Sequence, residues 1–215
     1  MNASWLKDEG FQGLSAKHLL VNPQAVRDTM GVYMIFLLDA DKILSCAGPS
    51  ETNILIPWSV SGHRHVYTGE GAAMRSRALL HLCGTIRDSS VREFLLSLQF
   101  SKNVLWPASS ETLFAMERRL TGWLIENSYV AFRACGYVGD VEKDLIRRMP
   151  SPFNIAHNSK SPFLPSLKAE RQKFRDHLET TRQKHYRVPM PPSAWLLRAN
   201  HLAGLASSQS TKPLT

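Results

Sequence analysis

The sequence has few of the features that mark disulfide-linked, secreted or membrane-spanning proteins. Its three cysteines, Cys46, Cys83 and Cys135, are odd in number and far apart, so neither a disulfide framework nor a zinc knuckle is indicated. The longest apolar run, GVYMIFLL, ends at Asp39 and is too short to span a bilayer. The N-terminus MNASWLKDEG lacks the basic-then-apolar order of a signal peptide. We therefore expect a reducing, cytoplasmic location and no membrane contact.

Acidic side chains are in the minority, which points to an anionic partner. The 215 residues contain 26 Lys and Arg against 18 Asp and Glu, a formal net charge of +8. Residues 151–215 hold ten of these cations and three of these anions, so +7 of the charge lies in the last third of the chain. Clustered cations attract phosphates and release their counterions, which favours nucleic acid without identifying it. The composition is otherwise that of a globular protein, with disorder expected only in the tail 206–215.

The pattern of apolar residues predicts an α+β fold. The segments GVYMIFLL, RHVYTG and VAFRAC are short and rich in β-branched and aromatic residues, so we interpret them as three strands. Helices are expected at about residues 72–83, 91–100 and 111–128. We thus predict a small antiparallel three-stranded sheet flanked by helices, with an insertion at 39–64 between the first two strands.

One carboxylate lies where an apolar side chain is expected. At about 100° per residue, Leu113, Leu120 and Leu124 fall on the same helical face as Glu117. A carboxylate is costly to bury without a partner, so a cation should meet it there, either an arginine or a metal ion. From the helix alone, a structural ion pair and a metal site both account for Glu117.

An arginine and a histidine lie one turn apart on the helix expected at 72–83. Arg77 and His81 are four residues apart, so both project from one face. A guanidinium offers a fork of donors that matches two phosphate oxygens, and an imidazole adds another donor. The pair suits phosphate binding, although a solvated basic face has the same pattern. Tyr33 and Tyr67, on the first two strands, are by themselves ordinary strand aromatics.

Taken in order, these residues resemble the GIY-YIG nuclease family. The first signature of the family is matched by GVY at residues 31–33, and the second by YTG at residues 67–69. The spacing to the family's arginine and histidine, its later helical glutamate within ERRLTGWLIEN, and its closing asparagine within PSPFN are also present. The matching positions are Tyr33, Tyr67, Arg77, His81, Glu117 and Asn154.

Two features depart from the family pattern, and one segment competes with it. Thr68 stands where the second signature usually has a branched apolar residue. The two signatures are also further apart than usual, because residues 36–65 intervene, which resembles the restriction-enzyme members more than the compact homing and repair modules. A second Tyr-x-Gly, at Tyr137 and Gly139, has Arg147 at the same offset but no histidine one turn later.

The resemblance implies hydrolysis of a DNA phosphodiester with one divalent cation, Mg²⁺ or Mn²⁺, bound by Glu117. A hard cation prefers oxygen ligands and often keeps several waters, so one carboxylate is a plausible protein ligand. By analogy with the family, Tyr33 would be the general base. Positive charge nearby would lower the pKa of its phenol toward neutral pH. Tyr67 would orient the water or the phosphate.

The remaining matching residues would act on the phosphate and on the cleft. Arg77 would neutralise charge that develops on the phosphate, and His81 would add a hydrogen bond. Asn154 would position the loop or the cleft wall with its amide. Double-stranded DNA is the expected substrate, and a palindromic target would imply a dimer.

The charged segment SLKAERQKFRDHLETTRQKHYR, expected to be helical at about 166–186, has two interpretations. It can be a solvated helix stabilised by ion pairs within the helix. Alternatively, its cations can lie along a DNA backbone and add affinity without sequence choice. The cations concerned are Lys168, Arg171, Lys173, Arg175, Arg182, Lys184 and Arg187. The predicted organisation is a helical extension at 1–30, a nuclease-like domain at 31–158, a basic helical extension at 159–205 and the tail.

Three functions fit this sequence. The leading hypothesis is a metal-dependent DNA endonuclease, for which the insertion and the basic C-terminal third favour the restriction type. The alternatives are a non-catalytic nucleic-acid-binding module of the same fold and a DNA repair or mobile-element nuclease. Retention of Tyr33, Arg77 and Glu117 argues against the binding module, and the lack of a Cys/His zinc module removes one common partner domain of the repair and mobile-element enzymes.

Overall fold

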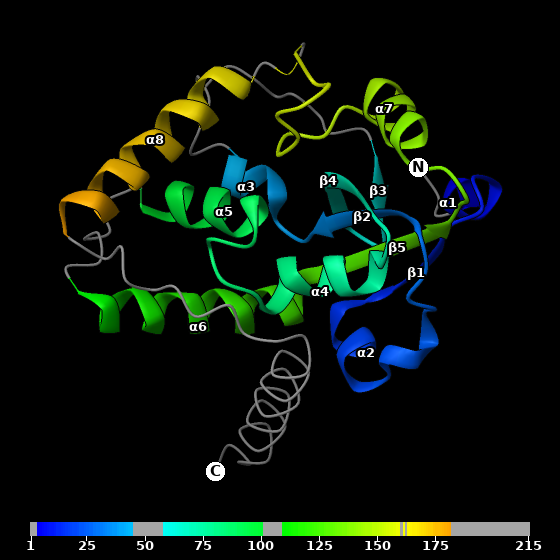
Figure 1. Ribbon diagram of the computed structural model, residues 1–215, viewed down its shortest axis with the longest axis horizontal. Coiled ribbons are helices and arrows are strands. Elements are labelled where there is room, and N and C mark those ends of the chain that lie inside the picture. The colour runs from blue at the N-terminus through cyan, green and yellow to red at the C-terminus, as the bar shows by residue number, and fades with distance from the viewer. Residues whose placement is uncertain (1–3, 45–57, 101–108, 160, 162, 182–215) are drawn as a thin grey trace.

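A computed structural model of the chain describes residues 4–44, 58–100, 109–159, 161 and 163–181 (Figure 1). The described part is an α+β fold built on one antiparallel sheet with the strand order β1-β5-β2-β4-β3. The strands are β1 (Gln12–Ser15), β2 (Gly31–Leu37), β3 (Ser59–Val60), β4 (His63–Gly71) and β5 (Ser128–Ala134). Within the described residues, no helix is long and apolar enough to cross a membrane.

The prediction of three strands was wrong, because the sheet has five. The three predicted strands are its centre, β5-β2-β4, and one short strand is added at each edge. β1 lies in the segment predicted to be a helical extension, and its sequence QGLS has little strand propensity of its own. Pairing with β5, with Gln12 opposite Phe132, holds it in the sheet. β3 lies in the predicted insertion and joins β4 through a tight turn in which Ser61 and Gly62 both have positive φ.

Helices cover both faces of the sheet. Their bounds are α1 (Ser4–Asp8), α2 (Ala16–Val21), the short 3-10 helix η1 (Pro23–Ala25), α3 (Ala40–Leu44), α4 (Met74–Cys83), α5 (Ser90–Phe100), α6 (Ser110–Asn127), α7 (Gly139–Arg148) and α8 (Leu164–Thr180). Since side chains alternate between the faces of a strand, β2 contributes Tyr33 and Ile35 to the larger core and Val32 and Met34 to the smaller one. Every residue of β2 is buried.

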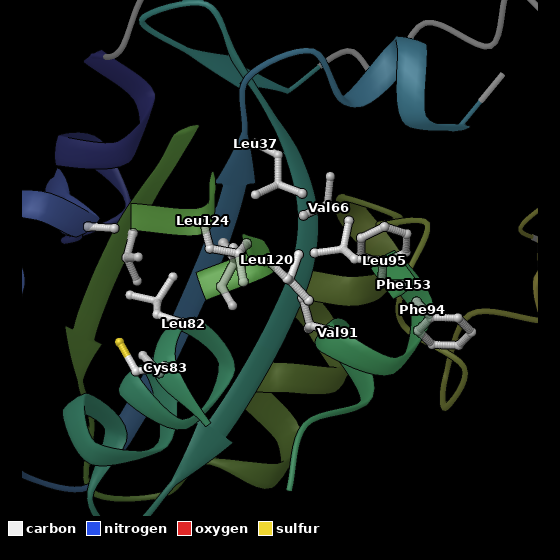
Figure 2. Close-up of a cluster of buried hydrophobic side chains, with 14 of the residues drawn as sticks. Leu37, Val66, Leu82, Cys83, Val91, Phe94, Leu95, Leu120, Leu124 and Phe153 are labelled. Carbon is white, nitrogen blue, oxygen red and sulfur yellow. The ribbon is translucent and has the colours of Figure 1, made fainter. Parts of the chain in front are cut away.

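The larger core joins the sheet to α4, α5 and α6. Figure 2 shows side chains from these helices meeting Leu37 of β2 and Val66 of β4. Phe94 of α5 stacks on Phe153, with ring centroids 5.6 Å apart, which ties the segment before α8 to this core. The smaller core lies under α1 and α7, which Figure 1 shows on the other side of the sheet centre from α5 and α8. α4 therefore packs against both the sheet and the helices α5 and α6.

The register between β2 and β4 decides which side chains meet beneath α4. Tyr33 lies opposite Gly69, and Ile35 lies opposite Tyr67. Tyr33 and Tyr67 are therefore diagonal neighbours on one face of the sheet. The long insertion between the two signatures leaves this pairing intact, and its described parts are α3, β3 and the turn into β4.

Candidate active site

Three of the predicted residues form a cluster under α4, in which Tyr33 and His81 are buried and Tyr67 is partly buried. The Tyr33 hydroxyl and His81 Nε2 are 2.8 Å apart in a hydrogen bond. The Tyr67 ring lies edge-on to the His81 ring at 4.9 Å, and the two tyrosine rings are 6.2 Å apart. We call these side chains the tyrosine–histidine cluster. It joins β2, β4 and the last turn of α4, so all three elements must be in place before it forms.

The glycine of each signature is explained by close packing rather than by backbone conformation. A Cβ atom at Gly69 would lie 2.5 Å from the Tyr33 ring and 2.8 Å from the Tyr67 ring, closer than such contacts occur. A Cβ atom at Gly31 would lie 2.5 Å from the Met74 sulfur at the start of α4. Gly69 therefore lets the two tyrosines approach the strand, and Gly31 makes room for both the main-chain oxygen of Arg133 on β5 and the start of α4.

The second ring nitrogen of His81 is bound by a serine that the sequence motifs do not include. His81 Nδ1 and Ser89 Oγ are 2.7 Å apart, and Ser89 Oγ also accepts a hydrogen bond from Arg92 N at the start of α5. Burial, together with the positive charges of Arg77 and Arg92, lowers the pKa of His81 to about 3. The ring is therefore neutral at physiological pH, and a neutral imidazole donates from one nitrogen and accepts at the other.

The pKa values of the two tyrosines move in the opposite direction to the one expected from the sequence. Burial, together with the neighbouring Tyr67, raises the pKa of Tyr33 well above its usual value, and Arg77 offsets this only in part. Burial also raises the pKa of Tyr67. Arg77 lowers the pKa of Tyr33, as predicted from the sequence, but removal from water outweighs the attraction of this one arginine. Both phenols are protonated at neutral pH.

Arg77 lies at the exposed edge of this cluster, one helical turn before His81. Its guanidinium donates a hydrogen bond of 3.4 Å to the main-chain oxygen of Asp88. It also lines a pocket of about 460 Å³ that extends toward α8. Arg77 is thus the predicted residue that faces both the buried phenols and an open cavity.

Glu117 is fully buried, as the periodicity of α6 predicts. Its Oε1 accepts a hydrogen bond of 2.7 Å from the main-chain N–H of Ile86. The buried side chain of Arg92 donates to the main-chain oxygen of Glu117 and to Thr121 Oγ1, each at 2.9 Å. The expected arginine does therefore reach this turn of α6.

The connection between α4 and α5 touches three of the predicted residues within four positions of the chain. Ile86 binds Glu117, Asp88 binds Arg77, and Ser89 binds His81. The bond of Ser89 to His81 could not be predicted from the sequence, since the contact depends on how α4 and α5 pack. The connection holds the catalytic candidates of two helices in one arrangement.

Asn154 binds the second signature through its main chain. Its Oδ1 accepts from the N–H of Thr68 at 2.8 Å, and its Nδ2 donates to the oxygen of Thr68 at 2.7 Å. The Thr68 side chain points to the other face of β4, where its Oγ1 lies 2.9 Å from His65 Nε2. The departure from the family pattern at Thr68 is therefore accommodated by a buried hydrogen-bond partner.

The competing Tyr-x-Gly segment does not build a second site. Tyr137 is 69% exposed, and Gly139 begins α7, on which Arg147 is also exposed. The same helix nevertheless influences the tyrosine–histidine cluster. Burial, reinforced by Glu70 on β4, raises the pKa of Glu142 to about 7, and Glu142 in turn raises the pKa of both cluster tyrosines.

Part of the predicted DNA-binding set lies on α8, and the structure gives these residues protein partners. Arg171 and Arg175 both form ion pairs with Glu93 of α5. Lys173 pairs with Glu170 at 2.8 Å, and Lys168 is exposed. Arg182, Lys184 and Arg187 lie outside the described residues. A role in DNA binding stays a prediction for all seven.

Comparison with known proteins places the chain in one family. The model of the GIY-YIG catalytic domain matches residues 31–183, which is well over half of the chain and includes both signatures, α6, Asn154 and α8. No curated protein and no solved structure matches it. The fold, the tyrosine–histidine cluster and the family match agree with the resemblance first found in the sequence, and the chain belongs to the GIY-YIG family of nucleases.

Proposed function

We propose that this protein is an endonuclease that hydrolyses phosphodiester bonds of double-stranded DNA with the help of one divalent cation, Mg²⁺ or Mn²⁺. The observation that carries the proposal is the tyrosine–histidine cluster, in which the Tyr33 hydroxyl binds His81 at 2.8 Å beside Tyr67. Arg77, on the same helix as His81, supplies the positive charge that a phosphodiester needs.

In this proposal each side chain has one task. Tyr33 would take a proton from the attacking water as a phenolate, since Arg77 lowers its pKa and a cation at Glu117 would lower it further, and the neutral His81 ring would donate a hydrogen bond from Nε2 to the phenolate oxygen. Ser89 Oγ would then donate a hydrogen bond to Nδ1 of His81. Tyr67 orients the water or the phosphate, and Arg77 stabilises the charge that develops on the phosphate.

The donor chemistry of Glu117 fits a divalent cation. An ionised carboxylate offers about four acceptor positions, and the Ile86 N–H uses one of them. Among the described residues, no group of three or more His, Cys, Asp or Glu side chains gathers around a common point. By the family resemblance, Glu117 would be the protein ligand, with water and substrate oxygens filling the shell, as Mg²⁺ often allows. The cation would supply positive charge that offsets charge on the phosphate in the transition state.

Asn154 would hold the second signature in place rather than touch the substrate, since the oxygen and the nitrogen of its side-chain amide both bind the main chain of Thr68. This arrangement supports the wall-positioning role that the family resemblance implies. It leaves Tyr67 and Gly69, on either side of Thr68, to shape the cluster.

Cleavage of plasmid DNA tests the proposal. Purified protein is incubated with supercoiled plasmid and MgCl₂ or MnCl₂, beside Arg77→Ala, Tyr33→Phe and the matched exposed control Arg119→Ala. We expect cutting by the wild type and the control, and a loss of about 100-fold or more in Arg77→Ala, as for removal of one transition-state donor. A folded wild type that binds DNA but cuts none of it with either metal would contradict the proposal and favour the binding module.

The same gel separates the possible roles. Discrete fragments that repeat from one preparation to the next would support a restriction enzyme, the role favoured by the long segment between the signatures. Nicking confined to branched substrates would support a repair role.

A further inference from the structure

The pocket beside Arg77 is lined by an unusual number of arginines. Its volume is about 460 Å³, within the range of ligand-binding pockets, and it lies between the α4–α5 connection and α8. Of the six proposed catalytic residues, Arg77 alone lines it. The wall carries four arginines against three carboxylates, namely Arg77, Arg87, Arg171 and Arg175 against Asp88, Glu93 and Glu179.

The α8 side of the pocket has two arginines and two carboxylates, since Glu179 lines it as well as Glu93, but both guanidinium groups pair with the one carboxylate of Glu93. Glu93 accepts hydrogen bonds from Arg171 at 2.5 Å and from Arg175 Nη2 at 3.0 Å, so one carboxylate faces two guanidinium groups. The Glu93 side chain is only 10% exposed, whereas that of Arg175 is 48% exposed. A guanidinium has five N–H donors, more than one carboxylate accepts. Arg175 can therefore bind an anion without releasing Glu93.

Arg171 and Arg175 differ in how firmly they are held. The Arg171 guanidinium lies over the Phe94 ring, 5.0 Å from its centroid, and its side chain is 18% exposed. Arg171 therefore anchors α8 to α5, and Arg175, one turn later and more exposed, faces the ligand space. The apolar surface of Leu113 and Leu178 in the same pocket could pack against a sugar or a base.

We propose that this pocket binds the nucleotide next to the scissile phosphate, and that Arg175 contacts the phosphate of that nucleotide. The inference rests on the proposed function, in which Arg77 holds the scissile phosphate. Successive phosphates of a strand are linked through one sugar, so a phosphate at Arg77 places its neighbour within the cavity that Arg77 also lines. α8 would then contact DNA through Arg175 at one phosphate, and not through all of its cations along the DNA backbone.

A binding experiment without cleavage tests this contact. Affinity for a labelled double-stranded oligonucleotide is measured by fluorescence anisotropy in EDTA over a series of salt concentrations. Arg175→Gln should weaken binding about fivefold to tenfold and reduce the slope of log K against log salt by about 1, the loss expected for one phosphate contact. Lys168→Gln, an exposed cation on α8 outside the pocket, should stay within about twofold of the wild type. Equal binding by the two variants would overturn the proposal.

A second variant separates lost charge from lost structure. Glu93→Gln removes the ion pair that Arg175→Gln removes and the Arg171–Glu93 pair as well, but it keeps both cations. It should bind DNA at least as tightly as the wild type. If Glu93→Gln binds as weakly as Arg175→Gln, and both melt at a lower temperature, undocking of α8 explains the loss and the pocket contact is refuted.

Plasmid cleavage by the wild type distinguishes failure of the pocket from failure of the proposed function. If the wild type cuts DNA with Mg²⁺ and Arg175→Gln binds and cuts like the wild type, only the pocket contact is wrong. If the wild type neither binds nor cuts DNA, both the pocket contact and the proposed function are refuted.

Discussion

The tyrosine–histidine cluster and the arginine-lined pocket share Arg77 as a neighbour but are built in opposite ways. In the cluster, polar groups are removed from water and bind one another, as Tyr33 does with His81. In the pocket, charged groups such as Arg175 stay partly in water and are paired across its wall. The first arrangement shifts pKa values and fixes geometry, whereas the second leaves charges that salt can screen.

Substitutions in the cluster and in the pocket should therefore affect different properties of the enzyme. Substitutions in the cluster should alter turnover and folding stability, with little dependence on salt. Substitutions in the pocket should alter DNA affinity and its salt dependence, with little effect on the chemistry once DNA is bound. Variants in and around the cluster test the first expectation.

The largest effect is expected at Gly69. A methyl group there would meet the Tyr33 ring at 2.5 Å, and buried backbone and rings leave little room to yield. We expect Gly69→Ala to cost about 3 kcal/mol of folding stability, the upper end of the usual cost of overpacking, and to abolish cleavage. Urea unfolding and the plasmid assay measure the two effects.

Gly122→Ala is the matched control for Gly69→Ala. Gly122 lies in α6, and nothing lies within 4 Å of its Cβ position. Alanine is favoured over glycine inside a helix by roughly 0.5–1 kcal/mol, so this variant should be slightly more stable and fully active. If Gly69→Ala proved as stable and active as Gly122→Ala, close packing would not be the reason for a glycine in the second signature.

A smaller effect is expected at Ser89, which positions His81 without reaching the substrate. Ser89→Ala removes the bond to His81 Nδ1 and the cap of α5 together. We expect a loss of about 1–2 kcal/mol in stability and of roughly 10-fold to 100-fold in the cleavage rate, since misplaced catalytic groups are costly. The rate is measured well below the melting temperature of the variant.

Ser109→Ala separates the two roles of Ser89. Ser109 caps α6 in a capping box, and its side-chain hydrogen bonds are with Thr112. Its removal should lower the melting temperature by a similar amount and leave the rate unchanged. A rate loss shared by both variants would mean that Ser89 acts through stability alone.

The sequence was sufficient for the parts of the site that depend on spacing along one element. Arg77 and His81 lie one turn apart on α4, and Glu117 lies on the buried face of α6, as their positions predict. The three central strands were also readable, because apolar runs such as GVYMIFLL are buried on both faces of the sheet.

What the sequence could not supply depends on contacts between elements. QGLS becomes a strand only because β5 offers an edge to pair with, and Arg92 meets α6 only because α5 packs there. The net pKa shift of Tyr33 could not be predicted from the sequence for the same reason. The sequence shows which charges are near in the motif, but not how completely α4 removes the phenol from water.

The smallest effect is expected at Glu142, at the margin of the cluster, and it depends on pH. Burial and Glu70 raise the pKa of Glu142 in the folded protein to about 7, from an ordinary value of 4.5. A raised carboxyl pKa means that the folded state binds the proton more tightly than the unfolded state. Its contribution to stability is therefore full below about pH 4.5 and is lost as pH rises toward 7.

Glu142→Gln should remove this loss, because glutamine carries no titratable proton. The melting temperature of the variant minus that of the wild type should rise between pH 4.5 and 7 and stay level above pH 7. Asp140→Asn, on the same helix with a side chain that is 76% exposed, should show no comparable rise. Since Glu142 also raises the pKa of both cluster tyrosines, the variant should shift the rising limb of the cleavage rate to lower pH. If Glu142→Gln had the same pH profiles of melting temperature and cleavage rate as the wild type, Glu142 would lie outside the electrostatic reach of the cluster. α7 would then serve only to cover the sheet.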